Sequence, residues 1–101
     1  MDIDTPVSTA TRAAISEVFQ STMRRFGLVD VAIWPDSDHD GDPVIRVEAK
    51  YEDNGEPVDT HVVADLLYKV NDAAMSTGER RFVHPTNRFG PGRRMLKREL
   101  A

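Results

Sequence analysis

Two stretches of alternating apolar and polar residues lie close together in the first half of this chain. The first covers residues 29–33 and the second residues 45–51. Because successive side chains of a strand point to opposite faces of a sheet, this period predicts two strands that each bury one face. The segment that joins them, Pro35 to Pro43, contains an Asp-Gly pair typical of tight turns. The sequence therefore predicts an antiparallel hairpin.

Amphipathic helical patterns flank this hairpin on both sides. Apolar residues recur at spacings of three and four between residues 15 and 26, and again between residues 62 and 74. Thr5-Pro6 is the expected start of the first helix, since a capping residue is followed by proline. Gly27 is its expected end, because glycine readily adopts the left-handed conformation that closes a helix.

Fewer elements can be predicted in the part of the chain that follows the second helix. Residues 80–84 are a candidate third strand, which Pro85 and the glycines and proline of residues 90–92 are expected to end. The element order is then α-β-β-α-(β). Each helix has one apolar stripe and the hairpin has one apolar face, so the simplest arrangement places both helices on one face of the sheet. The predicted fold class is α+β, a two-layer α/β sandwich.

Charge divides the chain into an acidic body and a basic end. Residues 1–78 carry 15 acidic and 6 basic side chains, whereas residues 79–101 carry 2 acidic and 7 basic ones. The whole chain has 101 residues and a net charge of −4, which suits one domain with a modest core. We expect a single α+β domain over residues 1–87 and a flexible basic C-terminal tail over residues 88–101.

Composition excludes several classes of protein. The chain has no cysteine, which rules out disulfides, thiolate metal sites, iron–sulfur clusters and a cysteine nucleophile. No apolar segment approaches the roughly 20 residues that span a bilayer, so no membrane-spanning helix is expected. The N-terminus is acidic and lacks the apolar region of a secretory signal, so the expected location is the cytoplasm.

The hairpin loop contains the most specific local signal, four carboxylates in seven residues around a glycine. Its first six residues follow the D-x-D-x-D-G pattern of a calcium loop, in which alternate side chains aim at one ion. The rest of that motif is missing, because Val47 stands where a bidentate Glu belongs and strands flank the loop. The candidate ligands for Ca²⁺ or Mg²⁺ are Asp36, Asp38, Asp40 and Asp42. The alternative is a solvated turn whose aspartates bond their own backbone.

Catalytic patterns are scarce. His39, His61 and His84 are the side chains best suited to proton transfer near neutral pH. No nucleophile motif, paired-carboxylate spacing or glycine-rich phosphate loop accompanies them. The sequence therefore predicts no catalytic residue and favours a non-enzymatic protein, without settling that question.

The basic end combines positive charges with apolar side chains. Such a mixture suits a groove on a protein partner or the phosphates and bases of a nucleic acid. Because the acidic body opposes phosphates at long range, a protein partner ranks above nucleic acid. The alternatives are a solvated terminus and a tail that folds back onto the body.

Trp34 is the second candidate for partner binding. Strand alternation places it on the face opposite Val31 and Ile33, where an exposed aromatic would mark a partner or self-association surface. The alternative is that neighbouring side chains or the tail cover it. The full set of partner-binding candidates is Trp34, Phe89, Arg93, Arg94, Met95, Lys97 and Arg98.

The segment WPDSDHDGDPVIRVE, which begins at Trp34, resembles part of a set of short bacterial proteins of unknown function. They share a D-H-D-G-[DE]-P hairpin between two strands, with helices on either side. The likeness covers residues 10–84 and stops before the tail. It implies no activity and transfers no catalytic residue, but it makes the Asp-rich hairpin the first segment to examine.

The function that the sequence favours is a small protein-interaction or regulatory module. Its partner would be an unidentified protein or a second copy of the chain. The first alternative is a Ca²⁺- or Mg²⁺-binding protein that uses the hairpin loop. The second alternative is a nucleic-acid binder that uses Arg93, Arg94, Lys97 and Arg98.

Overall fold

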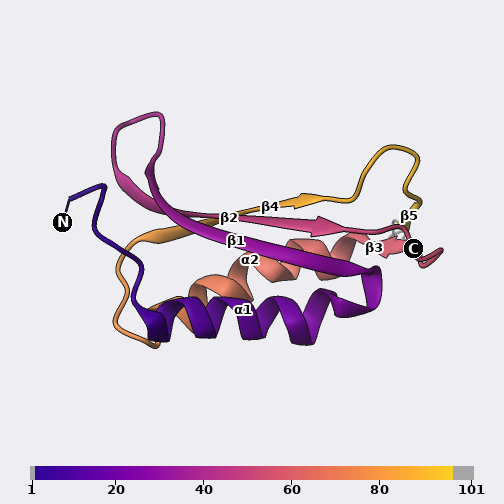
Figure 1. Ribbon diagram of the computed structural model, residues 1–101, viewed down its shortest axis with the longest axis horizontal. Coiled ribbons are helices and arrows are strands. Elements are labelled where there is room, and N and C mark those ends of the chain that lie inside the picture. Colours follow the sequence, from indigo (N-terminus) through magenta and orange to yellow (C-terminus); the bar gives the residue numbers. More distant parts are fainter. Residues whose placement is uncertain (1, 97–101) are drawn as a thin grey trace, which may run out of the picture.

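The computed structural model describes residues 2–96 and shows a sheet with two helices beneath it (Figure 1). The elements in chain order are α1 (Thr9–Met23), the 3₁₀ turn η1 (Arg24–Phe26), β1 (Leu28–Ser37), β2 (Pro43–Tyr51), β3 (Val58–Asp59), α2 (Thr60–Met75), β4 (Phe82–Arg88) and β5 (Met95–Leu96). β1 and β2 pair antiparallel, and both helices lie on the same face of the sheet. The predicted two-layer α+β sandwich is confirmed.

Helix α1 begins later than predicted. Its N-cap is Ser8, whose hydroxyl accepts a hydrogen bond from the Thr11 N–H at 3.1 Å. A side chain caps a helix when it lies two or three residues before a free backbone N–H of the first turn. Ser8 lies at this distance and Thr5-Pro6 does not. The predicted end is confirmed, because Gly27 follows η1 with a φ of +87°.

The main sheet has the strand order β1-β2-β4, and β2 pairs with β4 in parallel. A parallel neighbour requires a long crossover, which α2 supplies. β4 continues through Pro85 to Arg88, beyond the predicted range of 80–84. Val83 directs its N–H and C=O away from β2, and Pro85 lies two residues further along the same edge. The missing N–H of Pro85 therefore costs no bond within the sheet.

The core lies between the sheet and the helices. Its fully buried apolar side chains come from both helices, η1, β3 and the inward face of the sheet, and the largest are Ile15, Phe19, Met23, Phe26, Ile45, Val47, Val58, Leu66, Val70 and Val83. All of these except Val58 and Val83 are apolar positions of the helical and alternating patterns in the sequence. Within residues 2–96, no helix is long and apolar enough to cross a membrane.

The segment after β4 lies against the domain. The Phe89 ring packs on the Tyr51 ring at a centroid distance of 4.3 Å, and β5 pairs in parallel with β3. Arg93 is buried among backbone carbonyl groups. The described part of the tail expected from the sequence, residues 88–96, packs on the domain through Arg93 and Phe89. Residues 97–101 of the predicted tail lie outside the described residues.

One helix side chain contacts the backbone of one residue at each outer edge of the sheet. The Asn71 amide of α2 donates to the Val83 C=O at 3.0 Å and accepts from the Val83 N–H at 2.8 Å. At the other edge the Arg12 guanidinium of α1 donates to the Ile33 C=O of β1 at 3.0 Å. Uncovered edge groups would invite pairing with another strand. Each contact occupies backbone groups with which another strand would otherwise pair at Val83 or Ile33.

We expect the substitution Asn71→Leu to lower the free energy of unfolding by about 2 kcal/mol, because it leaves two backbone groups of Val83 without partners. Urea unfolding followed by circular dichroism measures the change. The control is Asp72→Asn at the exposed neighbouring position, which should leave stability unchanged. Equal stabilities for Asn71→Leu and the control would show that the edge contact contributes nothing.

A buried ion pair ties the N-terminal segment to the start of β4. The side chains of Arg81 and Glu79 are 3% and 6% exposed, and their closest N–O distance is 2.7 Å. Arg81 also donates to the carbonyl oxygens of Thr5 at 2.5 Å and Pro6 at 3.3 Å. The side-chain hydrogen bond from Arg81 is the main cause that lowers the pKa of Glu79. This contact positions residues 5 and 6 beside the core.

A pH dependence follows from the lowered pKa of Glu79. A carboxyl whose pKa falls on folding adds stability above its unfolded value, usually 4.5, and loses it as the pH falls through the folded value. We expect Glu79→Gln to cost about 2 kcal/mol at neutral pH and to reduce the loss of stability in acid. Unfolding at a series of pH values tests this. Parallel acid profiles of the variant and the parent chain would contradict it.

Candidate interaction surface

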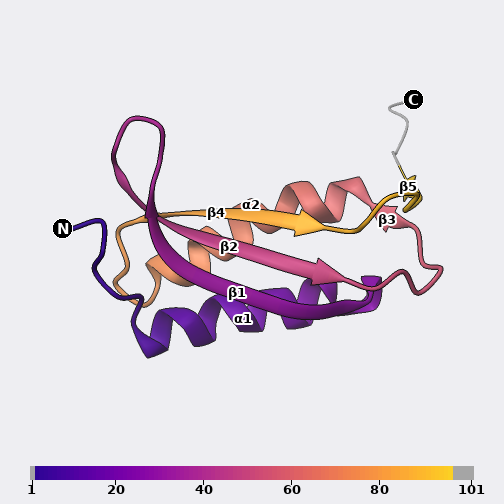
Figure 2. The ribbon, with the colours of Figure 1, turned by 45° about the horizontal axis from the view of Figure 1, so that its top comes forward.

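The face of the main sheet turned away from the helices is called here the outer face (Figure 2). Residues in register on neighbouring strands share a face of the sheet. Because Ile45, Val47 and Ala49 point into the core, the alternate residues of β2 and their partners point outward. The outer face consists of Asp30, Ala32, Trp34 and Asp36 from β1, Val44, Arg46, Glu48 and Lys50 from β2, and Phe82, His84, Thr86 and Arg88 from β4.

Large aromatic side chains gather at the hairpin end of the outer face. Trp34 is 38% exposed and Phe82 is 47% exposed. The Phe82 and His84 rings meet edge to face at 4.7 Å. Trp34 and His84 flank the same β2 residue, Arg46, from opposite sides. The outer face thus presents apolar surface from both outer strands. Strand alternation predicted that Trp34 lies on this face.

The charges of the outer face compensate one another. The Nε of Arg46 lies 3.3 Å from Oδ2 of Asp36, and the Nε of Arg88 lies 3.2 Å from Oε2 of Glu48. Solvent-accessible pairs of this kind contribute at most about 1 kcal/mol to stability. Because these charges are paired, the surface around the aromatic side chains is nearly neutral. Lys50 is exposed and forms no ion pair within residues 2–96.

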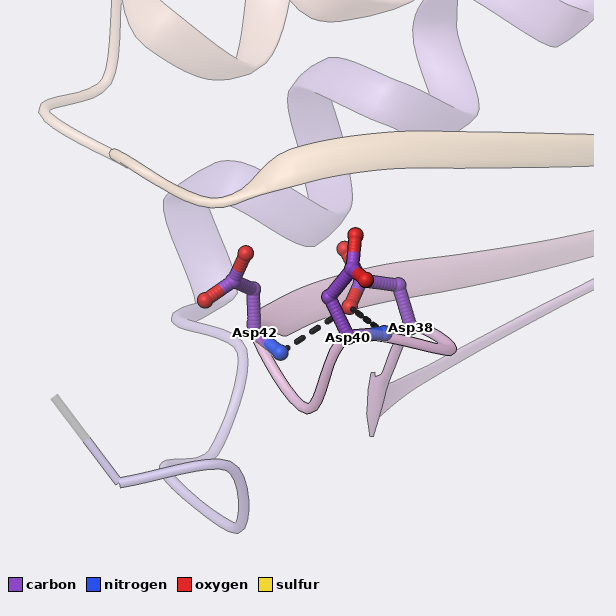
Figure 3. Close-up of side chains that lie close together, drawn as sticks. All are labelled: Asp38, Asp40 and Asp42. Carbon is purple, nitrogen blue, oxygen red and sulfur yellow. Dashed lines mark hydrogen bonds between the residues drawn. The ribbon is translucent and has the colours of Figure 1, made fainter.

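The hairpin loop, residues 38–42, is organised by one carboxylate (Figure 3). Oδ1 of Asp38 accepts hydrogen bonds from the backbone N–H groups of Asp40 and Asp42, both at 2.9 Å. The Gly41 N–H donates to the Asp38 C=O at 3.0 Å. Backbone donation, from Asp42 above all, lowers the pKa of Asp38. The Asp38 carboxylate thus bonds the backbone of its own loop, as in the solvated turn considered from the sequence.

The structure brings together three of the four carboxylates predicted as metal ligands. Oxygens of Asp38, Asp40 and Asp42 lie within 4.8 Å of one another, a spacing that one Ca²⁺ ion can bridge. Asp36 does not join them. Its carboxylate accepts from the Ser37 N–H at 2.8 Å and from Arg46 on the outer face. Three carboxylates supply only part of the six to eight oxygens of a Ca²⁺ site.

Arg93 is a structural residue in this fold. Its side chain is 2% exposed and donates to the carbonyl oxygens of Phe26 at 2.7 Å and Glu56 at 3.0 Å. Oδ1 of Asn54 accepts a further bond at 3.2 Å, and a carboxylate oxygen of Asp53 lies 3.6 Å away. This environment leaves the guanidinium without access to an external phosphate.

The remaining partner-binding candidates are dispersed. Phe89 packs on Tyr51 and is half-buried, while Arg94 is exposed just before β5 and Met95 is exposed within it. Lys97 and Arg98 lie outside the described residues.

Sequence reasoning did not name Phe82 as part of the surface, although alternation along the candidate third strand was the available signal. The three histidines lie on separate elements, namely the hairpin loop, the first turn of α2 and β4.

Comparisons of the chain with family models, with curated proteins and with solved structures find no match. The class of protein is therefore defined by its own architecture, a two-layer α+β sandwich with one sheet face open. Its function has to be argued from the residues on that face and in the adjoining loop.

Proposed function

We propose that this chain is a small non-enzymatic interaction module that binds a protein partner through the outer face. The proposal rests on the exposure of Trp34 on β1 and of Phe82 on β4, where Phe82 contacts the His84 ring, on a surface of balanced charge. Tryptophan and other large aromatic side chains supply much of the binding energy of protein interfaces. Exposed aromatic residues on one sheet face are typical of a surface that a partner covers.

The edge contacts of Asn71 and Arg12 favour docking on the face over strand pairing. Pairing of a partner strand with β4 would displace Asn71 from Val83, and pairing with β1 would displace Arg12 from Ile33. Docking on the outer face displaces no contact of this kind. Partner side chains would instead pack on the aromatic rings and exclude water from them.

A protein partner agrees better than nucleic acid with the charge of this region. The acidic hairpin loop adjoins the aromatic end of the outer face and would repel phosphates. Arg93, one of the four basic residues considered for phosphate binding, donates to internal carbonyl oxygens instead. Retardation of RNA or DNA at low salt, weakening steeply as salt rises, would favour the nucleic-acid alternative.

Site-specific photo-cross-linking tests the proposed function. A benzophenone amino acid replaces Phe82 on the outer face or, as the control, Tyr68 on the exposed side of α2. We expect irradiation of living cells to give protein adducts from position 82 and few from position 68, with mass spectrometry identifying the partner. Equal adduct formation at the two positions, or none at 82, would rule out the outer face as the binding surface.

Cation binding by the hairpin loop is the second candidate function, favoured by the spacing of Asp38, Asp40 and Asp42. Millimolar Ca²⁺ should then shift the amide NMR signals of the loop and raise the melting temperature of the parent chain. The double variant Asp40→Asn/Asp42→Asn should lose both responses, while the control Asp65→Asn on α2 keeps them. Identical responses of the parent chain and the double variant would exclude this site.

A further inference from the structure

The outer face is bordered by raised segments at both ends. The hairpin loop bends away from the helices at one end, and the connection from β4 to β5 rises on the same side at the other (Figure 1). A flat sheet laid on this face would meet these two segments before it reached the strands. A second copy that presented the same face would meet the same obstacle. A rod-shaped element between the raised ends avoids it.

An α-helix has suitable dimensions for this position. β4, the shortest strand of the main sheet, has seven residues and so spans about 23 Å at 3.3 Å per residue. A helix of about 15 residues has the same length. Helices that pack on a sheet tend to follow its strands, as α1 and α2 do on the opposite face (Figures 1 and 2). The aromatic rings of Trp34 and Phe82 would contact one apolar stripe of such a helix.

Charge selects the direction of this helix. The hairpin end of the outer face adjoins the three carboxylates of Asp38, Asp40 and Asp42, whereas at the opposite end Lys50 lies across from Asp30 and Arg88 is paired with Glu48. The N-terminus of a helix has partial positive charge and its C-terminus partial negative charge. The favourable orientation therefore places the N-terminus of the helix beside the hairpin loop.

We infer that the partner presents an amphipathic helix of about four turns that lies along β2 on the outer face, its N-terminus beside the hairpin loop and its C-terminus beside Lys50. This inference rests on the proposed function and adds the chemistry of the partner to it. The helix binds through an apolar stripe, with basic residues favoured in its first turn opposite the three aspartates.

A display library of helical peptides tests the inference with the full chain. The peptides have about 15 residues on an alanine-rich framework, with the positions of one stripe and of both end turns randomised. They are selected on the parent chain and counter-selected on Trp34→Ala. We expect the recovered peptides to bind about tenfold more weakly to Trp34→Ala and to Phe82→Ser, and equally well to the control Tyr68→Ala. Circular dichroism confirms that each variant is folded.

A nitroxide label then reports the orientation of the bound peptide. A label at the peptide N-terminus should broaden the amide signals of residues 38–42, and a label at its C-terminus those of Lys50 and Arg88. The opposite pattern would overturn the inferred direction. Failure to recover any peptide that depends on Trp34 would overturn the helical partner, as would a dimer in sedimentation that Trp34→Ala dissociates. A protein adduct at position 82 in either case would leave the proposed function standing.

Discussion

The substitution Gly27→Ala is expected to lower the free energy of unfolding by about 4 kcal/mol, which is a large part of the stability of a domain of this size. Gly27 has a φ of +87°, a conformation that costs other residues about 1–2 kcal/mol. A Cβ atom at this position would also lie 2.1 Å from the carbonyl oxygen of Glu52. Since that oxygen belongs to the backbone, the turn after η1 and the end of β2 would have to separate. Chemical unfolding measures the loss.

Gly55→Ala is the matched control for this prediction. Gly55 has a nearly identical φ of +82°, but an added Cβ would meet no atom within 4 Å. Its substitution should therefore lower the free energy of unfolding only by the cost of the positive φ, about 1–2 kcal/mol. The difference between the two variants isolates the contact with Glu52. If both variants lose the same stability, the close approach at Gly27 does not constrain the fold.

The second large effect is expected from Arg93→Ala, at about 3 kcal/mol. The substitution leaves buried carbonyl oxygens of Phe26 and Glu56 without a donor, and it removes the contact that joins residues 88–96 to the α1–β1 turn. Hydrogen exchange should then speed up at the amide of Val58, which donates to the Arg94 carbonyl oxygen at 2.9 Å. Urea unfolding gives the stability change and exchange gives its location.

Two comparisons separate this effect from loss of charge. Arg94→Ala removes the same charge from the next, exposed residue and should change stability by less than about 0.5 kcal/mol. Arg93→Lys keeps the charge but has all its donors on one nitrogen instead of across the planar fork of a guanidinium, so it should remain strongly destabilised. Full stability of Arg93→Lys would show that charge alone accounts for the role of Arg93.

The hairpin and helices were predictable because local patterns determine them. Alternation in β1 and β2 and the Asp-Gly turn between them specify an antiparallel pair, and one apolar stripe per helix specifies the two-layer arrangement. The predicted third strand is present as β4 but extends further than expected, and the sequence did not indicate that residues 88–96 pack on the domain. Pro85 breaks a strand only if its N–H is needed within the sheet, and Arg93 is buried only because carbonyl groups distant in sequence surround it. Neither the edge position of Pro85 nor the carbonyl groups around Arg93 can be inferred from neighbouring residues in the sequence.

The candidate site was predicted only in part, because it too depends on contacts between residues distant in sequence. Alternation alone placed Trp34 on the outer face, but Phe82 and His84 join it only because α2 returns the chain to pair β4 with β2. Long-range pairing of this kind leaves no periodic signal in the sequence. The acidic loop was visible as a cluster, whereas the contact of Asp36 with Arg46 depends on strand register and separates it from the other three aspartates.

The fluorescence of Trp34 tests the central claim most directly, because this residue is the one tryptophan of the chain and lies on the outer face. The measurement compares acrylamide quenching of the free chain with that of the chain saturated with the protein recovered by cross-linking, the partner's own tryptophans being replaced by phenylalanine. We predict that binding shifts the emission to shorter wavelength and protects Trp34 from quenching. A stable complex in which Trp34 is quenched as readily as in the free chain would contradict binding through the outer face.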